Sequence, residues 1–237
     1  MATKNFCVHG HFYQPPREDP ETGQIPNEES AGAFSNWNEK ITALCYAPNA
    51  VLGNFGRISF DLGPTLAGWL EKTHPDLHSE IIAQEADFFA RTGVSNAMAQ
   101  SYNHTILPLS NRSDKETQIR WGIADYMYRF GHEPLGLWAP ETAIDTETLE
   151  VMAENKIQFT ILAPWQADAP DDFDVSHPYR VKLPSGAEII VFFFAREPSL
   201  KVSFDADATI DANNYINDYI LPLFPIRGRV RRTFLIA

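Results

Sequence analysis

Short apolar segments of strand length alternate with longer segments of helical period along most of the chain. The strand-length segments are residues 6–12, 57–60, 97–101, 135–138, 158–162 and 233–237. The segments with helical period are residues 36–47, 64–72, 75–91, 113–131, 146–155 and 211–221. Parallel neighbours in a sheet need long crossovers, which are usually helical, so the alternation predicts an α/β fold whose parallel sheet is either open or closed into a barrel.

Local signals mark two helix starts and one hairpin. Ser113-Asp114-Lys115-Glu116 has the form of a capping box, in which the serine hydroxyl and the glutamate carboxylate each satisfy a backbone amide. Asp145 is a suitable N-cap for the next helix. Pro184-Ser185-Gly186, between residues 179–182 and 188–194, predicts a hairpin instead of another βα unit.

The composition indicates a folded protein with a sizeable core. The chain has 237 residues, of which 44% are hydrophobic and 21% charged, and this excludes intrinsic disorder. No repeat, low-complexity tract or linker divides it, so we expect a single domain over residues 1–237. Nineteen Lys and Arg against 31 Asp and Glu give a net charge of −12. Such a charge repels phosphate backbones and anionic lipids, so we expect no nucleic acid and no membrane as partner.

No window approaches the roughly 18 apolar residues of a membrane span, and the N-terminus lacks a cleavable signal, so we expect a cytoplasmic protein. Cys7 and Cys45 are far apart and have no CxxC spacing, which predicts buried, reduced thiols. A late basic run is interpreted as a solvated approach to the last strand. It consists of Arg227, Arg229, Arg231 and Arg232.

Polar and aromatic side chains gather where the expected strands end, which is where ligands bind in parallel α/β folds. They are His9, His11, Tyr13, Gln14, Asp61, Tyr102, Asn103, His104, Trp138, Glu141 and Trp165. Aromatic rings suit the apolar faces of a sugar, and the hydrogen-bonding groups suit its hydroxyls. The pattern therefore favours a carbohydrate ligand.

Three segments carry a family resemblance. They are His9-Gly10-His11-Phe12-Tyr13-Gln14-Pro15-Pro16, Tyr102-Asn103-His104-Thr105-Ile106-Leu107-Pro108-Leu109 and Gly136-Leu137-Trp138-Ala139-Pro140-Glu141. Together they resemble glycoside hydrolase family 57, a family of amylases, 4-α-glucanotransferases and α-glucan branching enzymes, and the likeness spans most of the chain. The resemblance implies an incomplete (β/α)7 barrel with parallel strands, no metal, no organic cofactor and a glucan substrate. It maps the family's nucleophile onto Glu141.

The chain departs from the family pattern in two places. The opening motif usually reads His-x-His-Gln-Pro, and Tyr13 stands where the second histidine would be. The family also carries an aspartate, its general acid and base, just after a later strand, whereas residues 233–237 contain no carboxylate. We therefore expect a barrel truncated at its C-terminus, without its last strands and helices and without its general acid, unless Asp168, Asp205 or Asp207 supplies the acid.

The sequence predicts a retaining glycoside hydrolase or glucanotransferase that acts on α-linked glucans through a covalent glycosyl-enzyme. Glu141 is the expected nucleophile. The expected substrate-binding residues are His9, His11, Gln14, His104, Trp138 and Trp165. The sequence does not indicate which glucan or linkage is used, whether water or a sugar accepts the glycosyl group, or the oligomeric state.

Each residue also has a structural interpretation. Glu141 is positioned to favour a nearby helix dipole, a pair of histidines such as His9 and His11 can be core residues, and His104 can stabilise a loop. Trp138 and Trp165 belong to a residue type that is common in cores. The position of Glu141 after Trp138, with two further motifs in order, favours the functional interpretation.

Two other function classes stay open from the sequence. A metal-dependent polysaccharide deacetylase has a similar barrel, and His9, His11 and His104 are possible nitrogen ligands, but neither His-x3-His spacing nor an Asp-Asp pair accompanies them. A catalytically incomplete carbohydrate-binding module is the other alternative, because the expected acid is missing.

Overall fold

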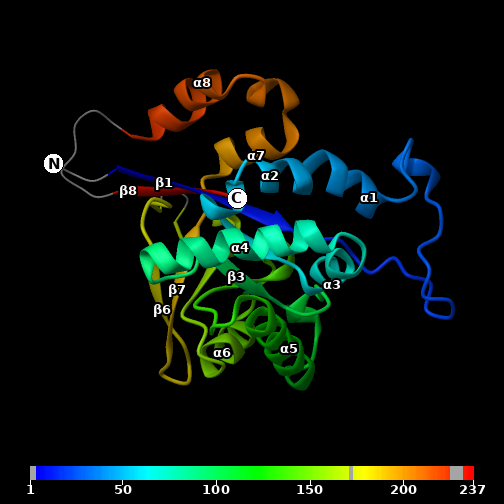
Figure 1. Cartoon of the computed structure of the whole chain (residues 1–237). Coiled ribbons are helices and arrows are strands. Elements are labelled where there is room, and N and C mark those ends of the chain that lie inside the picture. The colour runs from blue at the N-terminus through cyan, green and yellow to red at the C-terminus, as the bar shows by residue number, and fades with distance from the viewer. Residues whose placement is uncertain (1–3, 171–172, 225–231) are drawn as a thin grey trace. The chain divides into compact units, whose positions relative to one another are not determined.

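The computed structural model of the chain describes residues 4–170, 173–224 and 232–237. Its helices and strands alternate in the predicted order (Figure 1). The strands are β1 Lys4–Phe12, β2 Ser59–Leu62, β3 Ala97–Gln100, β4 Leu137–Trp138, β5 Phe159–Leu162, β6 Tyr179–Lys182, β7 Glu188–Phe193 and β8 Arg232–Ile236. The helices are α1 Trp37–Ile41, α2 Ala47–Val51, α3 Pro64–Thr73, α4 Pro75–Thr92, α5 Arg112–Phe130, α6 Thr146–Glu154, α7 Arg196–Phe204 and α8 Ala212–Tyr215.

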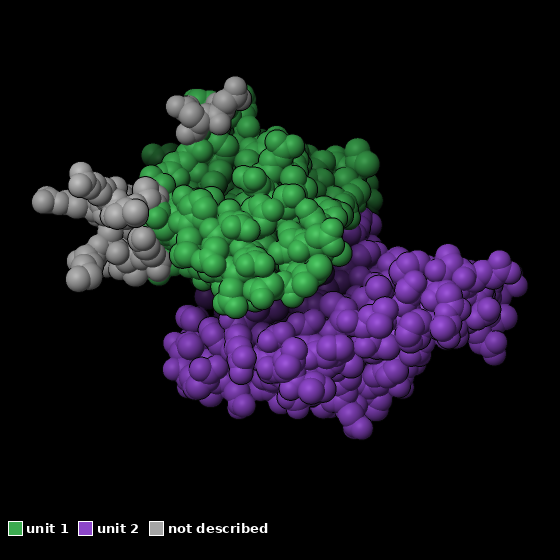
Figure 2. Space-filling view, turned by 90° about the horizontal axis from the view of Figure 1, so that it is seen from above, with its two compact units in different colours: residues 1–10, 106–115, 136–237 green, residues 11–105, 116–135 purple. Residues whose placement is uncertain are grey.

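The described residues form two compact units (Figure 2). Unit 1 comprises residues 1–10, 106–115 and 136–237, and unit 2 comprises residues 11–105 and 116–135. The chain passes from one unit to the other four times: within β1, after residue 105, within α5 and after residue 135. The expectation of one catalytic domain over residues 1–237 stays a prediction.

Unit 1 contains a mainly parallel array of strands. β1 pairs with β8 and β5 pairs with β7, both in parallel. Two parallel bridges extend the array, one from Gly136 before β4 to Phe159 in β5, and one from Phe194 after β7 to Leu235 in β8. β6 pairs antiparallel with β7, which confirms the predicted hairpin. The carboxyl ends of β4, β5 and β7 therefore lie at one edge of this array.

The packing of unit 1 follows from strand periodicity. β7 alternates buried and partly exposed residues, and its buried Val191 and Phe193 join Leu162 of β5 in one apolar cluster. Gly136 lies against the Phe159 ring where β4 approaches β5: a Cβ atom there would lie 2.4 Å from that ring, so any larger residue would force the ring to move. Glycine at this position thus lets the two strands pair.

Unit 2 is organised around the parallel pair β2 and β3. The rings of Phe12, Phe55 and Phe60 contact one another, and Phe55 and Phe60 are fully buried. Gly122 brings α5 against the end of β3, because a Cβ atom there would lie only 1.8 Å from the Gln100 carbonyl oxygen. This close approach fixes α5 beside the loop that follows β3.

Two of the predicted helices are interrupted where wide helical turns occur. The helix predicted over residues 36–47 is α1, a π-helical turn over Thr42–Tyr46, and α2. Pro48 has no backbone N–H, so it cannot make the regular hydrogen bond of an α-helix interior. The helix predicted over residues 211–221 is likewise α8 followed by a π-helical turn over Ile216–Ile220.

The structure corrects the start of α5 and adds one helix. The predicted capping box at residues 113–116 is wrong, because α5 already begins at Arg112 and the Asn111 Oδ1 accepts the Asp114 backbone N–H at 2.9 Å. α7 was not predicted, since its residues show no clear apolar period. Asp145 is confirmed as the N-cap of α6 through the Thr148 backbone N–H at 2.7 Å.

Two further expectations concern the periphery of the chain. No helix within the described residues is long and apolar enough to cross a membrane. Of the late basic run, Arg232 lies in β8, whereas residues 227, 229 and 231 lie outside the described residues.

A buried lysine joins the start of α5 to α6 inside unit 1. The Lys115 side chain is 2% exposed, and its Nζ donates to Asp145 Oδ2 and Glu147 Oε2, both at 2.8 Å. Burial lowers the pKa of Lys115, but the two carboxylates outweigh it and hold that pKa above its usual value. Burial raises the pKa of Asp145, but its hydrogen bonds from Lys115 and Thr148 outweigh burial and lower that pKa.

We expect Lys115→Met to reduce the free energy of unfolding by about 1–3 kcal/mol at neutral pH, since it removes two charge-assisted hydrogen bonds. Arg180→Met is the matched control, because the Arg180–Glu188 pair is equally short at 2.8 Å but Arg180 is 68% exposed. The control should change stability by no more than about 0.5 kcal/mol. Urea unfolding of the three proteins measures the difference.

The same comparison has a defined pH dependence. The folded-state pKa of Asp145 is lower than its unfolded value, so its contribution to stability is present above the unfolded pKa and is lost as the pH falls through the folded pKa. The difference in free energy of unfolding between the parent and Lys115→Met should therefore become smaller as the pH is lowered into the acid range. Equal losses for Lys115→Met and Arg180→Met at neutral pH would contradict this account.

Candidate active site

Glu141 lies directly after β4, in the 3-10 turn Pro140–Thr142 at the carboxyl edge of the unit 1 strands. Its side chain is exposed. Glu141 and Thr142 have φ values of 56° and 51°, two consecutive left-handed residues that are not glycine. Each such residue costs on the order of 1–3 kcal/mol, and strained backbone of this kind concentrates at functional sites. The turn is held by the Thr142 backbone N–H, which donates to the Ala139 carbonyl at 2.8 Å.

His9 and Trp138 pack on each other within unit 1. Their rings are stacked with centroids 4.9 Å apart and an interplanar angle of 13°. Both side chains are buried. The stack supports the strand end that leads to Glu141, and a direct contact of either ring with a sugar stays a prediction.

Trp165 follows β5 and is 58% exposed, which makes it the most accessible of the predicted sugar-binding aromatics. The Phe194 ring meets it edge-on at 5.7 Å, and the Arg196 guanidinium carbon lies 5.6 Å from its centroid. Phe194 and Arg196 follow β7. Because β4, β5 and β7 end at one edge, Glu141, Trp165 and Arg196 belong to the same edge of the unit 1 array.

A second cluster lies in unit 2, where β1 and β2 end. The His11 Nδ1 is 2.9 Å from the Oδ2 of Asp61, whose side chain is fully buried. On the other side of the ring, the His11 Nε2 is 3.2 Å from the His104 Nε2. The structure thus connects the first and second family motifs through two imidazoles and one carboxylate.

The hydrogen bonds of this cluster restrict the tautomers. An ionised Asp61 only accepts, so the His11 Nδ1 carries the hydrogen of that contact. With a neutral His11, the Nε2 then has only a lone pair, and His104 must donate to it. Asp61 therefore fixes both the orientation of His11 and the polarity of its outer nitrogen.

Tyr13 contributes to the same cluster by stacking. Its ring lies parallel to that of His104, with centroids 3.7 Å apart and an interplanar angle of 10°. His104 has a φ of 55°, another left-handed residue that is not glycine. The Tyr13 ring thus covers one face of His104.

Gln14 is oriented by its own neighbours. Its Nε2 donates to the Tyr46 hydroxyl at 3.1 Å, and its Oε1 accepts from Arg17 at 3.0 Å. Arg17 is in turn held by Asn38 at 2.9 Å and by Glu28 at 2.6 Å. Burial raises the pKa of Tyr46 to about 12, so its hydroxyl keeps its hydrogen. The amide of Gln14 is fixed but does not hydrogen-bond to either histidine of the cluster.

The structure thus places the seven predicted site residues in four environments. His11 and His104 contact each other, His9 and Trp138 contact each other, and Gln14 is held by a separate network. Glu141 and Trp165 lie at one strand edge of unit 1. The predicted set omits Asp61 and Arg196. The position of Asp61 at a strand end is visible in the sequence, but its pairing with His11, 50 residues away, is not.

No group of three or more His, Cys, Asp or Glu side chains in the described ranges is arranged to hold a metal ion. The deacetylase alternative needs such a group, because it uses a metal-activated water. The described residues therefore offer that alternative no preformed metal centre.

Comparison with known proteins identifies related sequences and folds. The sequence pattern of the family described as Glycosyl hydrolase family 57 matches residues 27–223. Alpha-amylase 1 of Dictyoglomus thermophilum is 25% identical over 143 residues, which are 58% of this chain and 20% of that protein.

Two solved structures are similar over 98% of this chain. The 4-alpha-glucanotransferase of Thermococcus litoralis has a TM-score of 0.71 at 17% identity, and this chain covers 33% of it. The exo-type maltose-forming amylase of Pyrococcus sp. ST04 has a TM-score of 0.73 at 15% identity, and this chain covers 42% of it. The predicted fold class, an α/β fold of the incomplete (β/α)7 barrel type with parallel strands, is confirmed by these likenesses. The chain spans a minority of the length of each relative.

We expect Asp61→Asn to change the tautomer of His11. In the parent, the His11 ring should carry its hydrogen on Nδ1, since Asp61 accepts there, whereas an asparagine amide can donate to Nδ1 and move the hydrogen to Nε2. Long-range ¹H–¹⁵N correlation of the ring nitrogens measures this. Glu39→Gln is the control, because Glu39 contacts His74 at 3.1 Å in the same unit and should leave the His11 signals unchanged. A parent His11 with its hydrogen on Nε2 would contradict the assignment.

Proposed function

Since this chain belongs to glycosyl hydrolase family 57, we propose that it forms part of the active site of a retaining glycoside hydrolase or glucanotransferase that acts on α-linked glucans. The observation that carries the proposal is Glu141, an exposed carboxylate on a left-handed turn at a strand edge. The relatives named as an amylase and a glucanotransferase support the substrate class.

Glu141 is the proposed nucleophile. One carboxylate oxygen forms a bond to the anomeric carbon while the glycosidic bond to the leaving oxygen breaks, giving a glycosyl-enzyme ester. A second carboxyl group, about 5–5.5 Å away in retaining enzymes, protonates the leaving oxygen and then takes a proton from the attacking hydroxyl. Water as acceptor gives hydrolysis and a sugar hydroxyl gives transfer.

The second carboxyl group must bind a proton near neutral pH, and this argues against one of its candidates. Lys201 donates to Asp205 at 2.7 Å, and this pairing lowers the pKa of Asp205. A general acid needs the opposite shift. Asp168 and Asp207 are exposed and stay candidates, as does a carboxylate elsewhere in the full-length protein.

The remaining site residues have binding roles in this proposal. Trp165 offers an exposed indole face to a sugar ring. His11 and His104 are assigned to the sugar-binding surface, with Asp61 as the residue that positions His11; a sugar hydroxyl that donates to the His11 Nε2 takes the place of the His104 contact there. These contacts are common to glucans of different linkage, and they apply equally to hydrolysis and to transfer.

We expect an activated glycosyl fluoride with a slow second step, such as a 5-fluoro-α-glucosyl fluoride, to label Glu141 covalently. Fluoride leaves without protonation, so the label forms even where the general acid is absent. Peptide mass spectrometry should place the adduct on the peptide that contains Glu141. Glu141→Gln should remove the label and reduce turnover by roughly three orders of magnitude.

Glu197→Gln is the matched control for this experiment. Glu197 is another exposed glutamate that follows a strand end in unit 1, and it should be dispensable for labelling. An adduct on any carboxylate other than Glu141, or turnover of Glu141→Gln within about tenfold of the parent, would disprove the assignment.

Because the proposed chemistry uses carboxylates alone, we expect treatment with EDTA to leave the rate of labelling at Glu141 unchanged. The labelling rate is measured on the untreated protein, on the protein after EDTA treatment and dialysis, and again after zinc is added back. Loss of the reaction on chelation and its recovery with zinc would favour the deacetylase type of site, in which a metal ion activates water.

A further inference from the structure

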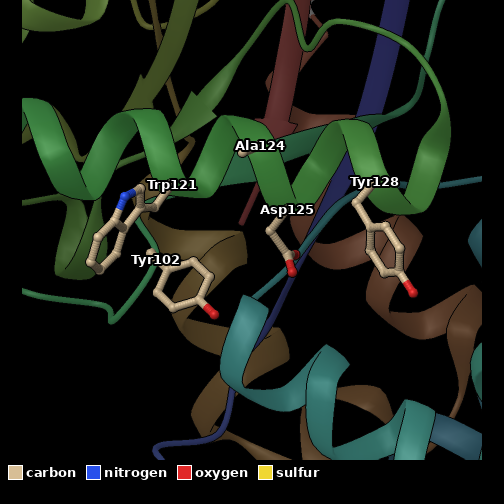
Figure 3. Close-up of a pocket in the computed structure, with 5 residues that line it drawn as sticks. All are labelled: Tyr102, Trp121, Ala124, Asp125 and Tyr128. Carbon is tan, nitrogen blue, oxygen red and sulfur yellow. The ribbon is translucent and has the colours of Figure 1, made fainter.

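An aromatic groove lies along one face of α5 in unit 2 (Figure 3). Its volume is about 470 Å³, within the range of about 300–1,000 Å³ that is usual for small-molecule sites. The residues that line it are Tyr102, Trp121, Ala124, Asp125 and Tyr128. The last four lie at positions i, i+3, i+4 and i+7 of α5 and therefore share a helix face. We call this surface the α5 groove.

The aromatic rings of the α5 groove are accessible. Trp121 is 52% exposed, Tyr128 is 71% exposed and Tyr102 is 37% exposed. The Tyr102 and Trp121 rings meet at 82° with centroids 5.6 Å apart, so together they form a corner. Figure 3 shows the three rings and the Asp125 carboxylate on the same side of α5. Three large aromatic side chains are thus gathered around one open depression.

Polar groups of fixed orientation lie among these rings. The Asp125 oxygens accept from the Nε and an Nη of Arg129, both at 2.9 Å. A carboxylate has about four lone pairs, so each oxygen can accept one more hydrogen. The Tyr128 hydroxyl donates to Glu71 at 2.8 Å and has its own lone pairs available as acceptors.

This combination selects the ligand chemistry. Ring faces suit the apolar faces of a sugar, and carboxylate and phenol oxygens accept hydrogens from its hydroxyls. The acidic groups Asp125 and Glu71, on a chain of net charge −12, disfavour phosphate-bearing or other polyanionic ligands. A neutral oligosaccharide satisfies both conditions.

The groove is also connected to the loop that carries His104. Tyr102 is two residues before His104, and the Tyr102 backbone N–H donates to the Gln118 carbonyl of α5 at 3.1 Å. The Asn103 backbone N–H donates to the Gln118 side chain at 2.8 Å. The same part of α5 therefore holds one wall of the groove and the loop of a proposed substrate-binding histidine.

We propose that the α5 groove binds a segment of α-glucan away from the bond that is cleaved. The identity of the sugar as an α-glucan rests on the proposed function, whereas the choice of a neutral oligosaccharide rests on the groove itself. A polymer engaged at two places gains affinity because the second contact becomes intramolecular. The groove would raise affinity for long glucans and leave short substrates unaffected.

The test compares retardation in native gels that contain soluble starch with covalent labelling of Glu141 by the short glycosyl fluoride. Trp121→Ala should weaken starch binding about five- to tenfold, the effect of losing one aromatic sugar contact. Its labelling should match the parent, because a single glucosyl unit does not need the groove. Trp121→Phe should retain most of the binding. Phe204→Ala, which removes an aromatic side chain that is 84% exposed in unit 1, is the control and should bind starch like the parent.

The outcomes test the α5 groove as a glucan site separately from Glu141 as the nucleophile. Weaker starch binding by Trp121→Ala supports the groove even if Glu141 is never labelled, and in that case only the proposed function fails. Equal retardation of the parent and Trp121→Ala, or no retardation of either, disproves the groove as a glucan site. A dimer in sedimentation that Trp121→Ala dissociates, without a change in starch binding, would assign the groove to a second copy of the chain instead.

Discussion

Parallel pairing is the constraint on which the arrangement of both units depends. A parallel neighbour can only be reached by a crossover, and every crossover returns the next strand in the same direction. The carboxyl ends of β4, β5 and β7 consequently share one edge in unit 1, and those of β2 and β3 do so in unit 2. Residues that are far apart in sequence, such as Glu141, Trp165 and Arg196, reach the same edge for this reason alone.

Buried or constrained groups then determine how the side chains at these edges are presented. Asp61 has no access to solvent and holds the Nδ1 of His11, so the outer nitrogen of that ring faces His104 in a defined state. Glu141 is positioned through the backbone, because two consecutive left-handed residues turn the chain after β4. Both the hydrogen bond to Asp61 and the left-handed turn reduce the conformational freedom of a candidate site residue before any ligand binds.

The sequence predicts the strand ends well and the contacts between them poorly. Apolar runs such as residues 158–162 have the length and β-branched content that strands need, and Asp145 carries its own capping signal. By contrast, Asn111 and Ser113 are both good N-cap types, and only packing decides that α5 begins at the earlier one. The left-handed turn at Glu141 contains no glycine that would signal it, and the pairing of Asp61 with His11 depends on the register of strands.

Adjacent positions on α5 have opposite freedom to vary. Gly122 is in such close contact with the Gln100 carbonyl that any side chain there would displace the helix, together with the backbone bonds from Tyr102 and Asn103 to Gln118. Trp121, one residue earlier, is 52% exposed, and its ring meets that of Tyr102 on the open side of the helix. The inner face of the helix is therefore fixed by close packing at Gly122, whereas the outer face at Trp121 is open to substitution. Substitution at Trp121 therefore changes the outer surface of the helix without placing atoms in the close contact between Gly122 and the Gln100 carbonyl.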